Sequence, residues 1–167
     1  MRILGLAGWS GSGKTTLLTT LLPLLAARGL SVSTVKHAHH DFDLDQPGKD
    51  SWRHRQAGAH EVLIAGSRRW ALLHENPGPE PTLDELLARM TPVDLVLVEG
   101  FKDYPHPKLE IHRPALGRPP LWPGRTDIVA VATDTTLPAC PRPVLKLSDA
   151  ACIAAWIVAF LPNARRT

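Results

Sequence analysis

The feature that most constrains this chain is a glycine-rich stretch near its beginning. Residues 8–15 read Gly-Trp-Ser-Gly-Ser-Gly-Lys-Thr, which fits the pattern G-x-x-x-x-G-K-[ST] at every position. The apolar run 2–7 before it predicts a buried strand, and the Leu- and Ala-rich segment 14–28, stopped by Gly29, predicts a helix that Pro23 kinks or breaks. A strand, such a loop and a helix in this order indicate a phosphate-binding loop.

Each part of the loop has its own expected role. Gly11 and Gly13 allow backbone angles that a side chain would forbid, so that amides at the start of the helix can approach a phosphate. We expect Lys14 to reach between the β- and γ-phosphates of a nucleotide, Thr15 to bind Mg²⁺ and Thr16 to touch the α-phosphate. The predicted nucleotide-binding set of this loop is Gly8, Ser10, Gly11, Ser12, Gly13, Lys14, Thr15 and Thr16, with Lys14 also a candidate catalytic residue.

A metal site at this loop needs an acid, and residues 93–100 (Val-Asp-Leu-Val-Leu-Val-Glu-Gly) offer two. The run predicts a central strand of the sheet. Ligand sites lie at the carboxyl ends of parallel strands, so Glu99 is the predicted Mg²⁺ ligand, through water, or the residue that orients the attacking water. Asp94, near the start of the run, is interpreted as structural.

The base of the nucleotide needs a reader of its own. A guanine reader uses a carboxylate that accepts hydrogen bonds from N1 and the exocyclic amine. Asp134 directly follows the predicted strand 128–133 and is the candidate. The sequence holds no Asn-Lys-x-Asp tetrapeptide, so the residues alone leave the choice between guanine and adenine open.

The rest of the pattern predicts an α/β protein. Short helices are expected over 50–57, capped by Asp50 or Ser51, and over 82–90, with Thr82 and Glu85 as a capping box. Further strands are expected at 30–35, 61–65, 69–74 and 144–147, and the turn at Gly66 and Ser67 would join 61–65 and 69–74 into a hairpin. A last helix is expected from Ser148 or Asp149 to Leu161, and 108–112 is expected to be an edge strand. Together they predict one domain over residues 1–167, a three-layer P-loop NTPase fold with a mostly parallel sheet and an inserted β-hairpin at 61–74.

Composition excludes several classes of protein. With 44% hydrophobic and 21% charged residues the chain is typical of a folded globular protein. No apolar run reaches the roughly 18 residues that span a bilayer, and a net charge of +3 with mixed signs does not indicate nucleic-acid binding. Two cysteines make no disulfide scaffold, and the apolar start is too short for a signal peptide, so we expect a cytoplasmic protein.

The segment from Lys36 to Asp50 is dense in ionisable groups and follows the second predicted strand. Three interpretations remain open: a switch loop whose acids touch Mg²⁺ and whose lysines touch phosphate, a site for an anionic partner ligand, and a solvated loop. Metal binding by His37, His39 and His40 is a further possibility, although three close histidines fix no geometry. The candidate residues are Lys36, His37, His40, Asp41, Asp43, Asp45 and Lys49.

Several blocks of the chain together resemble one protein family. They are the phosphate loop, residues 35–43 (Val-Lys-His-Ala-His-His-Asp-Phe-Asp), 48–51, 57–59, 94–102 (Asp-Leu-Val-Leu-Val-Glu-Gly-Phe-Lys) and 107–110. The Lys-His-x-x-His-Asp and Glu-Gly-Phe-Lys blocks are the most specific, and the resemblance runs from about Ile3 to Leu161. The family is MobB, the adaptor proteins of molybdopterin-guanine dinucleotide biosynthesis.

This resemblance implies a GTP-binding protein with at most a weak Mg²⁺-dependent GTPase activity. It would assist the molybdenum cofactor guanylyltransferase, which joins GMP to molybdopterin, and would form a homodimer. Molybdopterin is then a candidate ligand of the histidine-rich segment together with Lys102 or Lys108. Two alternatives stay open: a small-molecule kinase with Asp41, Asp43 or Asp45 as base, and a nickel-handling GTPase that uses the histidines.

Overall fold

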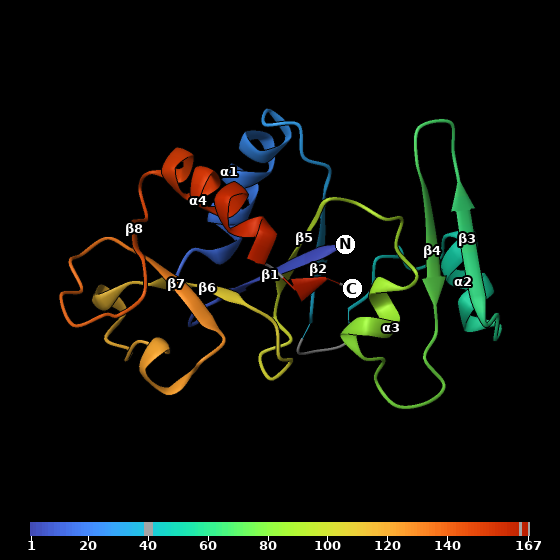
Figure 1. Ribbon diagram of the computed structural model, residues 1–167. Helices are drawn as coiled ribbons and strands as arrows, with labels where there is room; N and C mark the ends of the chain where they lie inside the picture. Colours follow the sequence, from blue (N-terminus) through green and yellow to red (C-terminus); the bar gives the residue numbers. More distant parts are fainter. Residues whose placement is uncertain (39–41, 164, 167) are drawn as a thin grey trace. The chain divides into compact units, whose positions relative to one another are not determined.

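The computed structural model describes residues 1–38, 42–163 and 165–166 (Figure 1). The chain divides into two compact units, one made of Met1–His37 with Leu87–Thr167 and the other of Ala38–Leu86. One domain over residues 1–167 therefore stays a prediction. None of the helices in the described part of the chain is long and apolar enough to cross a bilayer.

The larger unit is built on a mostly parallel sheet, as the sequence predicts. Its strands run in the order β2-β5-β1-β6-β7-β8, each parallel to its neighbours, and a short β9 pairs antiparallel with β1. Their bounds are β1 Arg2–Ala7, β2 Val32–Lys36, β5 Leu95–Glu99, β6 Lys108–His112, β7 Ile128–Thr133, β8 Val144–Lys146 and β9 Arg165–Arg166. Because β1 lies inside the sheet, the loop that follows it emerges between the carboxyl ends of neighbouring strands, where parallel sheets bind ligands.

Two helices, α1 (Lys14–Ala26) and α4 (Ala150–Phe160), pack against each other and against this sheet (Figure 1). Leucines of α1 and isoleucines of α4 are buried in one core with the strands. Of the kink or break expected at Pro23, the break does not occur: α1 continues through Pro23, the Ala27 N–H donates to the Pro23 carbonyl, and buried leucines lie on both sides. Asp149 caps α4, as predicted, by accepting from the Cys152 N–H.

The prediction of an edge strand at 108–112 is wrong, since β6 lies between β1 and β7 and all its residues are buried. Its polar side chains Lys108 and Glu110 find partners inside the protein. Lys108 Nζ lies 2.6 Å from the Asp127 carboxylate, and the carboxylate of Glu110 accepts from the backbone N–H groups of residues 121–122. Buried polar groups are tolerated when they are hydrogen-bonded in this way.

The smaller unit holds helix α2 (Asp50–Gln56) and the antiparallel pair β3 (Glu61–Ala65) and β4 (Trp70–His74), which confirms the predicted hairpin. Lys49 is the N-cap residue of α2, so the capping role expected of Asp50 or Ser51 is wrong. Asp50 instead occupies the first turn, where the helix dipole favours a carboxylate.

Helix α3 (Leu83–Leu87) follows the hairpin and begins as predicted. Thr82 N–H donates to the Glu85 carboxylate over 2.7 Å, and the Glu85 N–H donates back to the Thr82 hydroxyl over 3.3 Å. This reciprocal pair is the expected capping box. The helix ends three residues before the predicted end at Met90.

Candidate nucleotide-binding site

The backbone of residues 8–15 curves as a phosphate-binding loop does. Gly8, Gly11 and Gly13 all have positive φ, at 144°, 78° and 94°. At Gly8 a Cβ would also lie 2.5 Å from the Ile111 carbonyl oxygen, so the loop could not approach β6 with any other residue there. The Ser12 N–H closes a turn by donating to the Trp9 carbonyl. The loop leads directly into α1, whose first amides are available to an anion.

The side chain of Lys14 folds back across this loop. Its Nζ donates to the Gly8 carbonyl over 3.0 Å and to the Trp9 carbonyl over 3.1 Å. Burial lowers the pKa of Lys14, Glu99 partly offsets this by raising it, and the positive charges of Lys102 and Lys36 lower it further. An anion placed beside the ammonium group would relieve this penalty.

The two predicted metal ligands lie side by side. The Thr15 hydroxyl is 3.2 and 3.3 Å from the two carboxylate oxygens of Glu99, the last residue of β5. A hydroxyl and a carboxylate form the partial ligand set that Mg²⁺ accepts when waters and nucleotide phosphates complete its shell. At the other end of the same run, Asp94 accepts from the Ser31 N–H and hydroxyl, which confirms its structural role.

The turn that carries Glu99 is fixed against the end of β2. Gly100 has φ 96°, and a side chain there would collide with His37. The His37 ring stacks on Phe101 with centroids 4.6 Å apart, and the His37 N–H donates to the Glu99 carbonyl over 2.8 Å. Lys36 pairs in register with Glu99, so the structure brings this predicted residue to the same edge as the loop.

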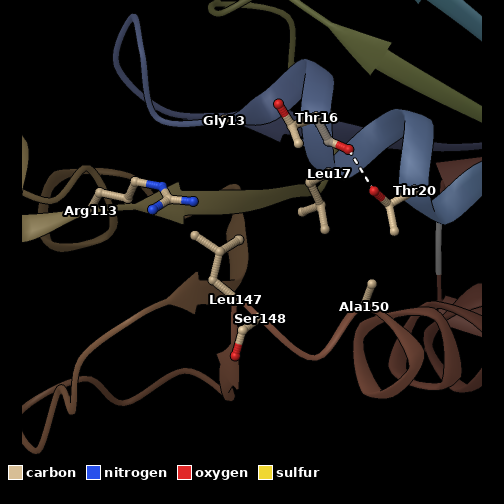
Figure 2. Close-up of a pocket in the computed structure, with 8 residues that line it drawn as sticks. All are labelled: Gly13, Thr16, Leu17, Thr20, Arg113, Leu147, Ser148 and Ala150. Atoms are coloured by element: carbon tan, nitrogen blue, oxygen red, sulfur yellow. Dashed lines mark hydrogen bonds between the residues drawn. The ribbon is translucent and has the colours of Figure 1, made fainter.

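Beside the first turns of α1 lies a cavity of about 170 Å³ (Figure 2). It opens among residues that follow β6 and β8, at the carboxyl edge of the sheet. It is smaller than the roughly 300–1,000 Å³ of complete small-molecule sites. Its lining residues are Gly13, Thr16, Leu17, Thr20, Arg113, Leu147, Ser148 and Ala150.

Asp134, the predicted base reader, is the first residue after β7. Its carboxylate lies 3.4 Å from the guanidinium of Arg113, which lines the cavity. Sequence analysis did not assign Arg113 to base recognition. Had β6 been placed beside β1, its next residue would have been expected at the phosphate loop.

The ionisable segment 36–50 divides between the two units. Its residues His39, His40 and Asp41 lie outside the described residues. Asp43 and Asp45 belong to the smaller unit, where their carboxylates bind Arg55 over 2.7 and 2.8 Å. The hydrogen bond from Arg55 is the main reason why the pKa of Asp43 is lowered. These two acids are therefore already paired, and Lys49 is exposed at the start of α2.

Lys108 does not form the exposed cationic surface suggested for a phosphorylated ligand. Its side chain is 3% exposed, and Nζ donates to two backbone carbonyls, of Tyr104 and His106, besides Asp127. Burial is the first cause of its lowered pKa. Within the described part of the chain, no group of three or more His, Cys, Asp or Glu side chains is placed to hold a metal ion.

Known proteins are similar to this chain in sequence and in fold. A relative from Haemophilus influenzae, a molybdopterin-guanine dinucleotide biosynthesis adapter protein, is 50% identical over 119 residues, 70% of this chain and 66% of its own length. One of the same description from Escherichia coli is 45% identical over 139 residues, 81% of this chain and 79% of its own. A crystal structure of molybdopterin-guanine biosynthesis protein B (mobB) matches with TM-score 0.75 at 28% identity, over 95% of this chain and 99% of that one.

The family described as "MobB: Molybdopterin guanine dinucleotide synthesis protein B" matches residues 3–134. That range includes the phosphate loop, the Glu99 turn, β6 and Asp134, and so covers nearly every element of the site built above. The match spans well over half of the sequence, and the resemblance noted from its motifs is confirmed: this chain belongs to the MobB family.

Proposed function

We propose that this chain is an adapter protein of molybdopterin guanine dinucleotide biosynthesis that binds Mg²⁺-GTP. The observation that supports nucleotide binding is the curved phosphate loop, in which Lys14 donates across the loop to the Gly8 carbonyl and the Thr15 hydroxyl donates to the Glu99 carboxylate. Membership of the MobB family supports the pathway. The adapter would bind GTP for the guanylyltransferase that attaches GMP to molybdopterin.

The residues of this chain divide the work on a bound nucleotide. Lys14 would leave its two loop carbonyls and bind the β- and γ-phosphates, to which the amides of the loop also donate. Mg²⁺ would be held by the Thr15 hydroxyl and, through water, by Glu99, and it would neutralise phosphate charge. The base would enter the cavity beside α1 and meet the carboxylate of Asp134.

GTP hydrolysis by the chain alone is expected to be slow. A phosphoryl-transfer site without an arginine supplied to the γ-phosphate lacks a contribution of about 10³–10⁵ in rate. Glu99 would orient the attacking water, so Glu99→Gln should reduce the slow turnover and leave GTP binding within a few-fold of the unaltered protein. Release of inorganic phosphate under single-turnover conditions measures this.

The kinase alternative finds little support in the described residues. Two of the acids considered as its base, Asp43 and Asp45, already accept charged hydrogen bonds from Arg55. A carboxylate with a lowered pKa, such as that of Asp43, is also a weak base toward an acceptor hydroxyl.

The hairpin supports the homodimer. Leu63, Trp70 and Leu72 are exposed by 60%, 68% and 45%, and Leu63 pairs with Leu72 across the two strands. A two-stranded sheet is only marginally stable in water, and an apolar face of this kind is normally covered. We propose a second copy of the chain as its cover, and Trp70→Glu should then convert a dimer to a monomer in sedimentation measurements.

A reconstitution experiment tests the proposed function. The chain, GTP, Mg²⁺, molybdopterin and the guanylyltransferase are combined, and the guanine dinucleotide product is measured against the enzyme alone. The proposal predicts a stimulation that Lys14→Ala abolishes and that an exposed charge variant, Arg89→Ala, retains. No stimulation by the unaltered chain would contradict the adapter role.

Thr15→Ala should still bind GDP but lose most of the Mg²⁺ dependence of GTP binding.

A further inference from the structure

Arg113 joins parts of the site that come from different strands. Its Nε donates to the Ser12 carbonyl of the phosphate loop over 2.9 Å, and its Nη1 lies 3.4 Å from Asp134 Oδ2. The same guanidinium lines the cavity beside α1 (Figure 2). One planar cation therefore touches the phosphate loop, the candidate base reader and the space where a base would lie.

The two contacts of Arg113 differ in strength. The bond to Ser12 has the length of a good charge-assisted hydrogen bond, and it anchors the guanidinium to the loop. The contact with Asp134 is long, and the two side chains are 42% and 40% exposed, so the pair itself is weak. Arg113 is thus fixed by the phosphate loop, and from there it presents Nη1 to the Asp134 carboxylate.

Arginine suits this place for a geometric reason. Its donors are held in a rigid fork, so Nε can bind the loop while Nη1 directs a carboxylate. Gly13, with φ 94°, leaves the guanidinium beside the start of α1, where an added Cβ would stand 3.6 Å from Nη2. A lysine, with one rotating ammonium group, could not fix both partners in one plane.

We propose that Arg113, which lines the cavity, is a specificity-positioning residue: it turns the neighbouring Asp134 carboxylate toward a bound base, so that this carboxylate accepts both N1–H and the exocyclic amine of guanine. The inference rests on the proposed function, because it requires a guanine nucleotide at this site. A site built to bind a donor of its ligand rejects analogues that lack the donor, since its own polar group is then left unpaired.

The test compares GTP with inosine triphosphate, which keeps N1–H and lacks the exocyclic amine. Displacement of a fluorescent GDP analogue gives both affinities for the unaltered chain, Arg113→Ala, Arg113→Lys, Asp134→Asn and the double variant Arg113→Ala/Asp134→Asn. We expect the unaltered chain to prefer GTP by tenfold or more, and Arg113→Ala and Arg113→Lys to lose most of that preference. The double variant should lose no more than Asp134→Asn alone. A merely structural role would not change this ratio.

The inference is overturned by equal losses for the two nucleotides in Arg113→Ala, by tighter binding of GTP in that variant, or by additive losses in the double variant. Circular dichroism and the thermal midpoint show that each variant is folded, and Arg89→Ala controls for the lost charge. Failure of the unaltered chain to bind GTP would overturn the proposed function and this inference together. Loss of selectivity confined to Asp134→Asn would overturn the inference alone.

Discussion

At the phosphate-loop edge of the larger unit three lysines lie near one carboxylate, whereas in the smaller unit three carboxylates bind one arginine. The first set is Lys14, Lys36 and Lys102 with Glu99, and the second is Asp43, Asp45 and Glu75 with Arg55. In the second set every acid is within 3.0 Å of the guanidinium. In the first set Lys14 donates to backbone carbonyls and Glu99 accepts from a hydroxyl.

The pKa directions separate the two regions. The pKa of Lys14 is lowered, first by burial, so its charged form is less favoured than that of a lysine in water. The pKa of Asp43 is also lowered, but for an acid this means that the charged form is favoured, by the hydrogen bond from Arg55. A region whose charge is disfavoured gains from a ligand of opposite sign, whereas a region whose charge is satisfied stabilises the fold.

Lys14→Ala should impair ligand binding at the phosphate-loop edge, and we expect it to have the largest effect on GTP affinity of the changes considered. Removing a charge-assisted contact worth about 1.5–3 kcal/mol should weaken GTP binding by roughly ten- to a hundredfold or more. Titration calorimetry measures the loss, and an unchanged thermal midpoint shows that the fold persists. Binding within threefold of the unaltered protein would show that the edge does not depend on this ammonium group.

Arg55→Ala should remove the shared partner of the three carboxylates in the smaller unit and so lower the stability of that unit. It leaves three carboxylates without their shared partner, among them Asp45, whose side chain is only 4% exposed. We expect faster amide hydrogen exchange in α2 and β3, a lower thermal midpoint, and GTP affinity within about twofold. A loss of GTP binding with exchange unchanged would reverse the roles assigned to the two regions.

Asp134→Asn extends the comparison to the base. It replaces an acceptor of two hydrogen bonds by a group that presents a donor, so GTP affinity should fall by about tenfold, or roughly 1.4 kcal/mol, while ATP affinity changes little. Competition between the two nucleotides for one fluorescent probe measures this. Equal changes for GTP and ATP would remove Asp134 from base recognition.

The smallest expected effect is on the pKa of Lys14 itself. This pKa lies below the ordinary lysine value, and the phosphate oxygens of bound GTP should raise it, since they favour the charged form. Between the two values GTP binding takes up a proton, so affinity should fall as the pH rises through the pKa of the bound state. Nuclear magnetic resonance of the Lys14 side chain measures both values, and a pKa that GTP leaves unchanged would contradict a direct contact.

Sequence alone predicted the parts of the site that follow from local patterns. The spacing of its glycines, lysine and threonine predicted the phosphate loop. Parallel-sheet geometry predicted that Glu99, and not Asp94 at the other end of the same run, lies at the carboxyl end of the strand. The capping residues Thr82 and Asp149 were predictable because a cap needs only neighbours along the chain.

The parts that sequence analysis missed depend on distant partners. β6 was expected at the edge of the sheet, and the groups that satisfy its polar residues Lys108 and Glu110 lie well away along the chain, at Asp127 and residues 121–122. The place of Arg113 beside the phosphate loop was also missed, because it depends on the order of the strands in the sheet. The pairing of Asp43 and Asp45 with Arg55 was likewise invisible to a pattern-based interpretation, which treated these acids as free.

The central claim is that this loop binds Mg²⁺-GTP, and competition tests it directly. A fluorescent GTP analogue is bound to the unaltered chain with Mg²⁺ present, and unlabelled GTP or ATP is added. The account predicts that GTP displaces the probe at a concentration at least about tenfold lower than ATP does. Adenine cannot donate the two hydrogen bonds that guanine gives to the Asp134 carboxylate, and their loss is worth roughly that factor. Failure of the probe to bind, or equal displacement by ATP, would contradict it.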